Sequence, residues 1–283
     1  MTRAAQGIRT AVVGSGVAGL TAAHILARRH DVVMYEGDDR TGGHAHTHDV
    51  PSADGRVHQV DSGFIVHNRR TYPNLLRLFS ELGVTTQASE MSMSVRCEGC
   101  GLEYAGARGP SGLFAQARNV TRGRYLRMLA EVPVFHRAAR RLLAEVLGAF
   151  RYSRNSTVLH TDTGVLPRGA RARAAWNYLM PTCGVAADRV RVSYDMNRLQ
   201  RLTAPETFVV TLGGEDRVDP GRVLARMTYE HPVLTPESVA AQQRLPGLGG
   251  PRTAYAGAYH GWGFHEDGCR SGAAAAAALG VVW

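Results

Sequence analysis

The sequence contains no lysine, and all 33 of its basic residues are arginine. Without a lysine amine, the chain cannot form a Schiff base with a carbonyl substrate or use a lysine as a catalytic base. The formal net charge of +9 could suit an anionic membrane surface or a nucleic acid. The arginines are scattered through every segment, however, and no dense run of them matches a row of phosphates, so we expect no nucleic-acid partner.

Long apolar runs are also lacking. The longest, Gly272 to Trp283, is too short to cross a bilayer, and the opening "MTRAAQGIR" lacks the apolar core of a secretion signal. The chain has only four cysteines, which do not make a disulfide framework in a protein of this size. We therefore expect a cytoplasmic protein, with the inner face of the membrane as a second location.

The first structural pattern in the sequence lies near the N-terminus, where two apolar runs flank a helical segment. Residues 8–13 ("IRTAVV") and 31–36 ("DVVMYE") have the composition of buried parallel strands, and residues 20–29 have the apolar spacing of a helix. The second strand ends at Glu36, where an acid can accept the hydroxyls of a ribose. This order of strand, helix, strand and acid is typical of a dinucleotide-binding domain.

A glycine motif of the form G-x-G-x-x-G follows the first strand. Gly14 allows a tight turn, Gly16 lets backbone N–H groups approach a pyrophosphate at the positive end of the helix, and Gly19 lets helix and strand pack closely. The residues expected around the phosphates are Gly14, Ser15, Gly16, Val17, Ala18 and Gly19. The motif is weak evidence alone, but it is strong evidence within this frame.

The residues after Glu36 resemble the flavin amine oxidase and phytoene desaturase superfamily. Arg40, Gly42 and Gly43 complete an E-x-x-x-R-x-G-G pattern, and "DSGF" resembles the segment that these proteins lay beside the flavin ring. His44 stands where family members often have a further arginine. The resemblance implies a cofactor site that includes Glu36, Gly37, Arg40, Gly42, Gly43, His44, Gly63 and Phe64.

The C-terminal stretch resembles the second half of the same family signature. The text "AYAGAYHGWGFHEDGCRSGAAAAAALG" predicts a strand, a glycine turn and a terminal helix, and the family points the N-terminus of that helix at the flavin. Ala258 stands where the family's ribityl-contacting aspartate is usual, so Asp267 or Glu266 would have to substitute. This end of the chain adds Gly257, Glu266, Asp267 and Gly268 to the expected site, and the resemblance makes FAD the expected cofactor.

Further matches, such as "GGHAHT", "DSGFIVHNRRTYPNL" and "WGFHEDG", resemble bacterial proteins described as NAD/FAD-binding, amine-oxidase-like oxidoreductases. The implied fold is α/β, a doubly wound, Rossmann-like FAD-binding domain of the glutathione-reductase type with an abbreviated α+β substrate cap. We expect the FAD-binding domain to comprise residues 1–70 and 251–283, and the cap to comprise residues 71–250. Family members are longer between residues 139 and 150, which indicates either a compact variant or an internal deletion.

Two further clusters have a chemical and a structural interpretation. His44, His46 and His48 are two residues apart and could hold a metal, but no carboxylate or cysteine follows at ligand spacing. Cys97 and Cys100 form one C-x-x-C, which is half a zinc site or a redox dithiol, with Cys183 and Cys269 isolated. We expect a structural turn at Cys97 and no metal.

Aromatic residues cluster in the second half of the sequence. Trp176, Asn177 and Tyr178 lie in strand-like text, either as core or as the wall of an apolar tunnel. Residues 125–147 are amphipathic, either as a packed surface helix or as a helix that contacts the membrane. Aromatic side chains also crowd the C-terminal motif, as an apolar substrate site would require: Tyr255, Tyr259, Trp262 and Phe264.

The resemblance implies an FAD-dependent oxidoreductase that abstracts hydride, as in desaturation, from a lipid acyl chain or another apolar substrate. No residue stands out as an obligatory acid or base. One alternative is a catalytically impaired or non-enzymatic FAD- or lipid-binding protein that arose by internal deletion. Another is an amine oxidase, although the lysine that many of those enzymes place near the flavin cannot exist here. The expected partners are a small-molecule or lipid substrate and, peripherally, a membrane surface.

Overall fold

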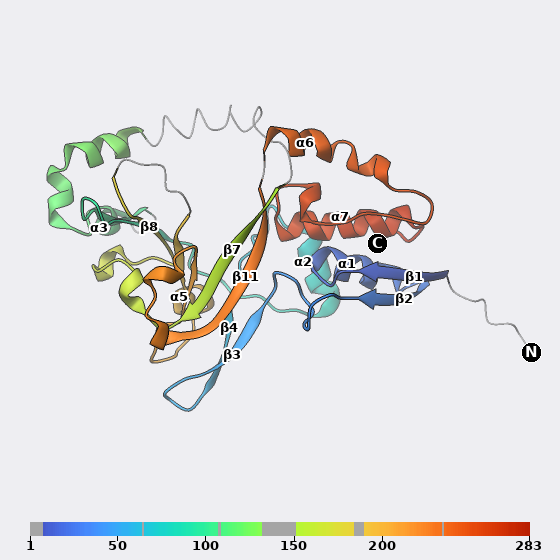
Figure 1. The fold of residues 1–283 in the computed structure, drawn as a ribbon, viewed down its shortest axis with the longest axis horizontal. Coiled ribbons are helices and arrows are strands. Elements are labelled where there is room, and N and C mark those ends of the chain that lie inside the picture. Colours follow the sequence, from blue (N-terminus) through green and yellow to red (C-terminus); the bar gives the residue numbers. More distant parts are fainter. Residues whose placement is uncertain (1–7, 64, 107–108, 132–150, 184–189, 234) are drawn as a thin grey trace, which may run out of the picture.

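A computed structural model describes residues 8–63, 65–106, 109–131, 151–183, 190–233 and 235–283. These residues form a small α/β unit from the two ends of the chain and a larger sheet from its middle (Figure 1). The strands are β1 (Ile8–Val13), β2 (His30–Tyr35), β3 (Thr47–Pro51), β4 (Val57–Asp61), β5 (Met93–Cys97), β6 (Glu103–Ala105), β7 (Arg151–His160), β8 (Trp176–Met180), β9 (Val192–Asp195), β10 (Val209–Leu212) and β11 (Val223–Val233). The α-helices are α1 (Val17–Leu26), α2 (Pro73–Leu82), α3 (Gly109–Leu113), α5 (Met196–Gln200), α6 (Pro236–Gln242) and α7 (His265–Ala278).

The small unit joins the N-terminal and C-terminal segments. β1 and β2 are parallel, and α1 is the crossover between them. α7 packs along α1 (Figure 1), and their backbones touch, because a Cβ added at Gly272 would lie 2.3 Å from the carbonyl oxygen of Ala18. Ile25, Leu26 and Ala276 are buried between these elements. The two chain ends therefore meet, as the sequence predicts.

The larger sheet has seven strands in the order β11-β7-β10-β9-β8-β5-β6. Its described pairings are antiparallel except for β5 with β8. β7 and β11 pair over most of their length and form the long ribbon that reaches toward α7 (Figure 1). The core on one face of the sheet is built around Leu159, Met196, Phe208 and Val210.

The hairpin of β3 and β4 and the segment after it connect the two units. β4 ends at Asp61, and the buried Ser62 then bonds through its hydroxyl to the Tyr229 hydroxyl of β11, at 2.7 Å. α2 follows, and its first N–H groups, at Asn74 and Leu75, donate to the carboxylate of Glu266 at the start of α7. Side chains from both units thus hold the connecting segment in place.

The predicted α/β, Rossmann-like architecture is confirmed. The expected strand–helix–strand frame is present as β1, α1 and β2, and no helix in the described part of the chain is long and apolar enough to cross a membrane. The division into residues 1–70, 71–250 and 251–283 stays a prediction. Residues 123–131 are helical, but the rest of the amphipathic segment and the junction at 139–150 lie outside the described residues.

Two expectations are wrong. The text before α7 is not a strand: only an isolated bridge between Gly250 and Thr253 forms there. A strand needs a neighbour with free backbone groups, and no described strand lies beside residues 254–257. Cys183 is not isolated either, because its Sγ lies 3.3 Å from the Sγ of Cys97.

Candidate functional site

The two glycine-rich ends of the chain open onto one cleft of about 600 Å³ between the small unit and the large sheet. The sequence-predicted cofactor residues that line it are Gly14, Gly16, Val17, Ala18, Gly19, Gly43, His44, Gly63 and Gly257. Other predicted residues do not line it, namely Ser15, Glu36, Gly37, Arg40, Gly42, Glu266, Asp267 and Gly268, and Phe64 is outside the described residues. The fold therefore brings the N-terminal and C-terminal motifs to the same space.

Each glycine of the first motif has a different structural reason to lack a side chain. Gly14 has φ +93°, which favours glycine. A Cβ on Gly19 would lie 1.9 Å from the carbonyl oxygen of Gly14, so that position lets α1 approach the turn. Nothing lies within 4 Å of the position that a Cβ on Gly16 would occupy. Gly16 is the N-cap of α1, and no side chain caps the first N–H groups of this helix. An anionic group can therefore approach these donors directly.

The second glycine pair packs on the first motif. The N–H of Gly42 donates to the carbonyl oxygen of Ser15 at 3.1 Å, and a Cβ on Gly43 would lie 3.0 Å from the Cα of Gly16. The Arg40 guanidinium donates to the carbonyl oxygen of Gly43. Arg40 therefore shapes the loop and does not line the cleft.

Glu36 holds the first loop together. Its carboxylate accepts from the hydroxyl and the N–H of Ser15 and from the N–H groups of Gly37 and Asp38. These bonds, the Ser15 hydroxyl above all, lower the pKa of Glu36 to about 2. The carboxylate is therefore ionised at neutral pH, as acceptance of two ribose hydroxyls requires.

The C-terminal acids have capping contacts. Asp267 accepts from the N–H groups of Trp262 and Phe264 and pairs with Arg270 at 2.8 Å. Glu266 accepts from the first turn of α2. Neither carboxylate lines the cleft. Gly257, by contrast, lies on its surface, and its N–H donates to the Ser271 hydroxyl at 2.9 Å.

The wall opposite the glycine loops consists of aromatic and imidazole side chains. Most come from the large sheet: Tyr152, Trp176, Tyr194, Tyr229 and His231, joined by Tyr72, Tyr259, Phe264 and His265. Burial lowers the pKa of His265 to about 3, and it also lowers the pKa values of His44 and His231. The histidines of the cleft are therefore neutral at physiological pH, and Glu230 adds an acidic residue to the lining.

Two nitrogens at this wall are buried with no hydrogen-bond partner in the described part of the chain: His44 Nε2 and Trp176 Nε1. Burial lowers the pKa of His44, so its ring is neutral, and the hydrogen bond to the backbone of Glu230 uses the other ring nitrogen as donor, which leaves Nε2 as an acceptor. A buried polar atom without a partner is costly. Both nitrogens are therefore positioned to bond a ligand, one as acceptor and one as donor.

The remaining predicted residues do not line the cleft. His46 and His48 stack with ring centroids 4.0 Å apart, and His46 bonds to the Tyr229 hydroxyl at 3.2 Å. Asn177 is buried and accepts from the Ser94 hydroxyl at 2.6 Å. Tyr178, Tyr255 and Trp262 do not line the cleft.

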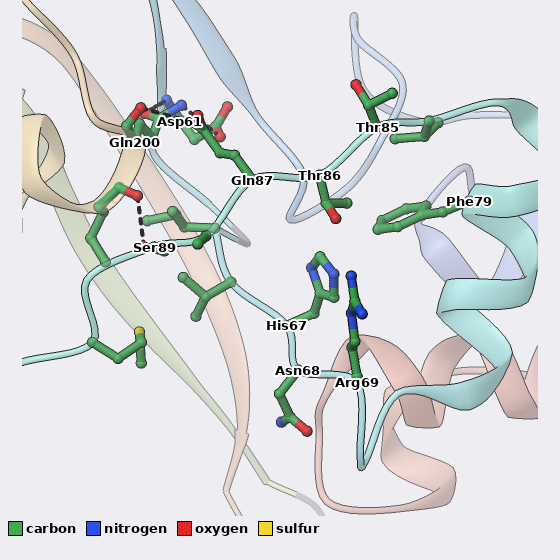
Figure 2. Close-up of a pocket in the computed structure, with 16 residues that line it drawn as sticks. Asp61, His67, Asn68, Arg69, Phe79, Thr85, Thr86, Gln87, Ser89 and Gln200 are labelled. Atoms are coloured by element: carbon green, nitrogen blue, oxygen red, sulfur yellow. Dashed lines mark hydrogen bonds between the residues drawn. The ribbon is translucent and has the colours of Figure 1, made fainter.

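A second cavity of about 630 Å³ adjoins the first, and Ile65, Val66 and Leu199 line both. Figure 2 shows His67, Arg69 and the ring of Phe79 around it, with Gln200 hydrogen-bonded to Asp61 on its far side. Gln200 Nε2 donates to Asp61 Oδ2 at 2.9 Å. This cavity is more polar than the cleft, and the positively charged side chain of Arg69 is part of its lining.

Sequence reasoning missed six wall residues: Tyr72, Tyr152, Tyr194, Tyr229, His231 and His265. Tyr229 and His231 are two residues apart on β11 and so share one face of the strand. The two-residue spacing of these side chains could have indicated that they share one wall. Tyr152 and Tyr194 come from other strands, and only the strand order brings them to the same wall.

Comparisons with known proteins support this assignment of the fold. Residues 12–82 match the family model of the NAD(P)-binding Rossmann-like domain. Among curated proteins, none matches the sequence.

Several solved structures have the same overall fold. A candidate protoporphyrinogen oxidase from Exiguobacterium superposes with a TM-score of 0.57 at 11% identity, covering 96% of this chain and 98% of that one. A fatty acid isomerase from P. acnes that produces CLA gives 0.57 at 15% identity, covering 95% and 98%. Cyclohexylamine oxidase from Brevibacterium oxydans gives 0.54 at 12% identity, covering 96% and 98%. The chain thus has the fold of amine-oxidase-like oxidoreductases.

Proposed function

We propose that this chain is an FAD-dependent oxidoreductase that acts on an apolar substrate, with a lipid acyl chain as the favoured class. The observation that carries the proposal is the cleft that joins the glycine loops of both chain ends to a predominantly aromatic wall. The glycine loops suit a dinucleotide, and the wall suits an apolar molecule beside it. The matching fold of a fatty acid isomerase supports the same class of substrate.

The residues of the cleft fit FAD. Gly16 leaves open space at the N-terminus of α1 for the pyrophosphate, and the ionised Glu36 lies at the end of β2 for the ribose. His44 Nε2 and Trp176 Nε1 are free to bond polar atoms of a ring system or a substrate. When bound, the flavin would supply the hydride acceptor. The protein would orient the substrate C–H bond and exclude water with the aromatic wall.

The adjoining polar cavity offers a place for the head of a lipid. An acyl chain that passes Ile65 and Val66 into the cleft would leave its carboxylate or headgroup beside Arg69 and His67. A guanidinium is a suitable partner for such an anion. An amine substrate would make no use of this cation, so Arg69 separates the two substrate classes.

Amine oxidation is the second candidate, because cyclohexylamine oxidase shares the fold and the neutral histidines of the cleft would tolerate an uncharged amine. A third candidate is a catalytically impaired FAD- or lipid-binding protein. Its support is the exposure of apolar side chains on the small sheet, where Ile8 is 64% exposed. Such exposure is expected if neighbouring strands have been lost.

The first experiment is the visible absorption spectrum of the purified protein, with its Tm measured in the presence and absence of FAD. A ligand that binds only the folded state stabilises it, by about 2.7 kcal/mol at a concentration 100 times its Kd. We expect a yellow protein, or a Tm that rises with FAD. A colourless protein whose Tm ignores FAD would refute the cofactor assignment.

A matched pair of variants tests whether FAD binds at the glycine loop. Gly16→Leu fills the open space at the start of α1, where nothing lies within 4 Å of the Cβ position. Gly123→Leu makes the same change at an exposed glycine far from the cleft. We expect both apo proteins to melt alike and only Gly123→Leu to retain the FAD-induced rise in Tm.

The substrate class is tested by anaerobic bleaching of the flavin. We expect a long-chain fatty acid to bleach it and cyclohexylamine to leave it yellow, with Arg69→Ala raising the KM for the fatty acid. Bleaching by the amine alone would make the chain an amine oxidase. Bound flavin that no candidate reduces would favour the impaired or non-enzymatic binder.

A further inference from the structure

Three of the four cysteines converge at one point of the large sheet, in the part of the chain that the structure describes. The thiols of Cys97, Cys100 and Cys183 all lie within 4.8 Å of one another, and the Sγ atoms of Cys97 and Cys183 are 3.3 Å apart. Tetrahedral zinc with Zn–S bonds of 2.3 Å would separate its sulfurs by about 3.8 Å. The fourth cysteine, Cys269, is buried in α7 and belongs to the small unit.

The turn that carries Cys97 and Cys100 has the build of a metal-binding knuckle. Cys97 ends β5, and its N–H donates to the carbonyl oxygen of Leu102 at 2.8 Å, which closes the turn. Gly101, just after the second cysteine, has φ +67° and so adopts the left-handed conformation that favours glycine. The sequence C-x-x-C-G therefore presents both thiols on the same side of a closed turn.

Sheet pairing delivers the third thiol. β8 runs parallel to β5 with Met180 opposite Cys97, and the N–H of Glu98 donates to the carbonyl oxygen of Met180 at 2.9 Å. The chain leaving β8 thus passes directly over the turn. Gly99 makes room for it, because a Cβ there would lie 3.1 Å from both the N and the Sγ of Cys183.

Arginines surround the turn. Arg118 and Arg122 donate to the carbonyl oxygens of Gly101 and Cys100 at 2.6 Å and 3.0 Å. Three thiolates with one Zn²⁺ carry a net charge of −1, and neighbouring guanidinium groups offset that charge. The same groups fix the backbone of the turn, as the outer contacts of a metal site do.

We propose that Cys97, Cys100 and Cys183 bind one Zn²⁺ ion, with the fourth position open to water or an added ligand. The proposal does not depend on the proposed oxidoreductase function. A disulfide between Cys97 and Cys183 would explain only two of the three thiols and would need an oxidant. The site lies away from the cleft: Cys97 pairs with Met180, and Trp176, which lines the cleft, is four residues earlier on β8, about 13 Å along the strand. Zinc would fasten the β5–β6 turn to the end of β8.

The test is to purify the full-length protein without chelator and to measure its metal content by elemental mass spectrometry. We expect one zinc per chain in the wild type and in the matched control Cys269→Ala. Cys100→Ser and Cys183→Ser should lose it, with an affinity for added Zn²⁺ at least about 100-fold weaker, since even outer-contact changes cost 10–100-fold. Circular dichroism of each variant shows that the loss of zinc is not a loss of fold.

Titration of the reduced, zinc-free protein with Co²⁺ gives a second readout that does not depend on purification. Thiolate coordination should produce a sulfur-to-cobalt charge-transfer band that Cys183→Ser weakens and Cys269→Ala leaves unchanged. Absence of zinc and of this band in the reduced wild type would overturn the proposal. So would zinc retained by Cys100→Ser and Cys183→Ser, or a Cys97–Cys183 disulfide in a protein that binds no metal after reduction.

Discussion

Strands β1 and β10 are both short runs rich in valine, yet their surroundings are opposite. Val209 and Val210 of β10 are fully buried, whereas Ile8 and Val13 of β1 are 64% and 83% exposed. β10 lies between β7 and β9, while β1 pairs, among the described residues, only with β2. Apolar composition is similar in both places, but the number of neighbouring strands decides how much each strand stabilises the fold.

The protein thus consists of a densely packed sheet and a more lightly packed binding unit. The sheet carries most of the large buried side chains, and the small unit, apart from Ile25 and Leu26, carries the glycine loops and their open space. Loops that bind ligands are commonly drawn from the less stable parts of a protein. Substitutions in the two regions should therefore differ in cost, and four of them test the contrast.

The largest effect is expected in the sheet. Phe208→Ala removes a ring that is 1% exposed and should lower the free energy of unfolding by about 3–5 kcal/mol. Phe264→Ala is the matched control, because that ring is 57% exposed at the edge of the cleft, and its cost should stay below about 1 kcal/mol. Urea denaturation followed by circular dichroism measures both, and equal costs would remove the distinction between the regions.

Acid should also destabilise the sheet through His160. The side chain is fully buried, Nε2 bonds to the Thr211 hydroxyl at 2.8 Å, and burial lowers its pKa to about 4. The unfolded chain takes up a proton below its ordinary pKa of about 6.5, and the folded chain does so only near 4, so stability falls as pH drops through this window. The loss should reach about 3 kcal/mol.

The variant His160→Gln tests whether His160 causes the loss of stability in acid, because glutamine can donate to Thr211 without titrating. Unfolding free energies measured by urea between pH 7 and pH 4 should decline less steeply in the variant than in the wild type. Parallel pH profiles would show that other groups, such as the histidines of the cleft, cause the acid sensitivity.

A smaller effect is expected where the small unit is held together. Gly272→Leu places a Cβ 2.3 Å from the carbonyl oxygen of Ala18, so α1 and α7 must separate at a cost of about 1–3 kcal/mol. Ala274→Leu makes a similar change on the exposed face of α7 and should be nearly neutral. FAD-dependent Tm shifts should disappear in Gly272→Leu and persist in Ala274→Leu, and a retained shift would mean that the helix contact does not shape the cofactor site.

The smallest effect belongs to the exposed strand. Ile8→Ala should change the free energy of unfolding by no more than about 0.5 kcal/mol, because the side chain is 64% exposed. The measurement is again urea denaturation, at two protein concentrations. A cost above about 1.5 kcal/mol would show that β1 is covered in solution, and a cost that grows with concentration would point to a second copy of the chain.

Much of the small unit follows from the sequence. Gly14, Gly16, Gly19 and Glu36 could be assigned because each answers a local need: a turn with positive φ, an open approach, a close contact and an acid at the end of a strand. Local needs leave a pattern in neighbouring residues. The C-terminal strand was predicted wrongly because strand formation also needs a partner, and residues 254–257 have none among the described residues.

The sequence by itself determined the glycine loops, the helix between β1 and β2, and the identity of the two chain ends that meet. Only the tertiary structure decided the capping contacts of Asp267 and Glu266, the aromatic wall, and the convergence of Cys183 with Cys97 and Cys100. The reason is physical. Turns and helices are stabilised by residues a few positions apart, whereas the wall and the thiol cluster depend on strand order and register, which join residues separated by many tens of positions.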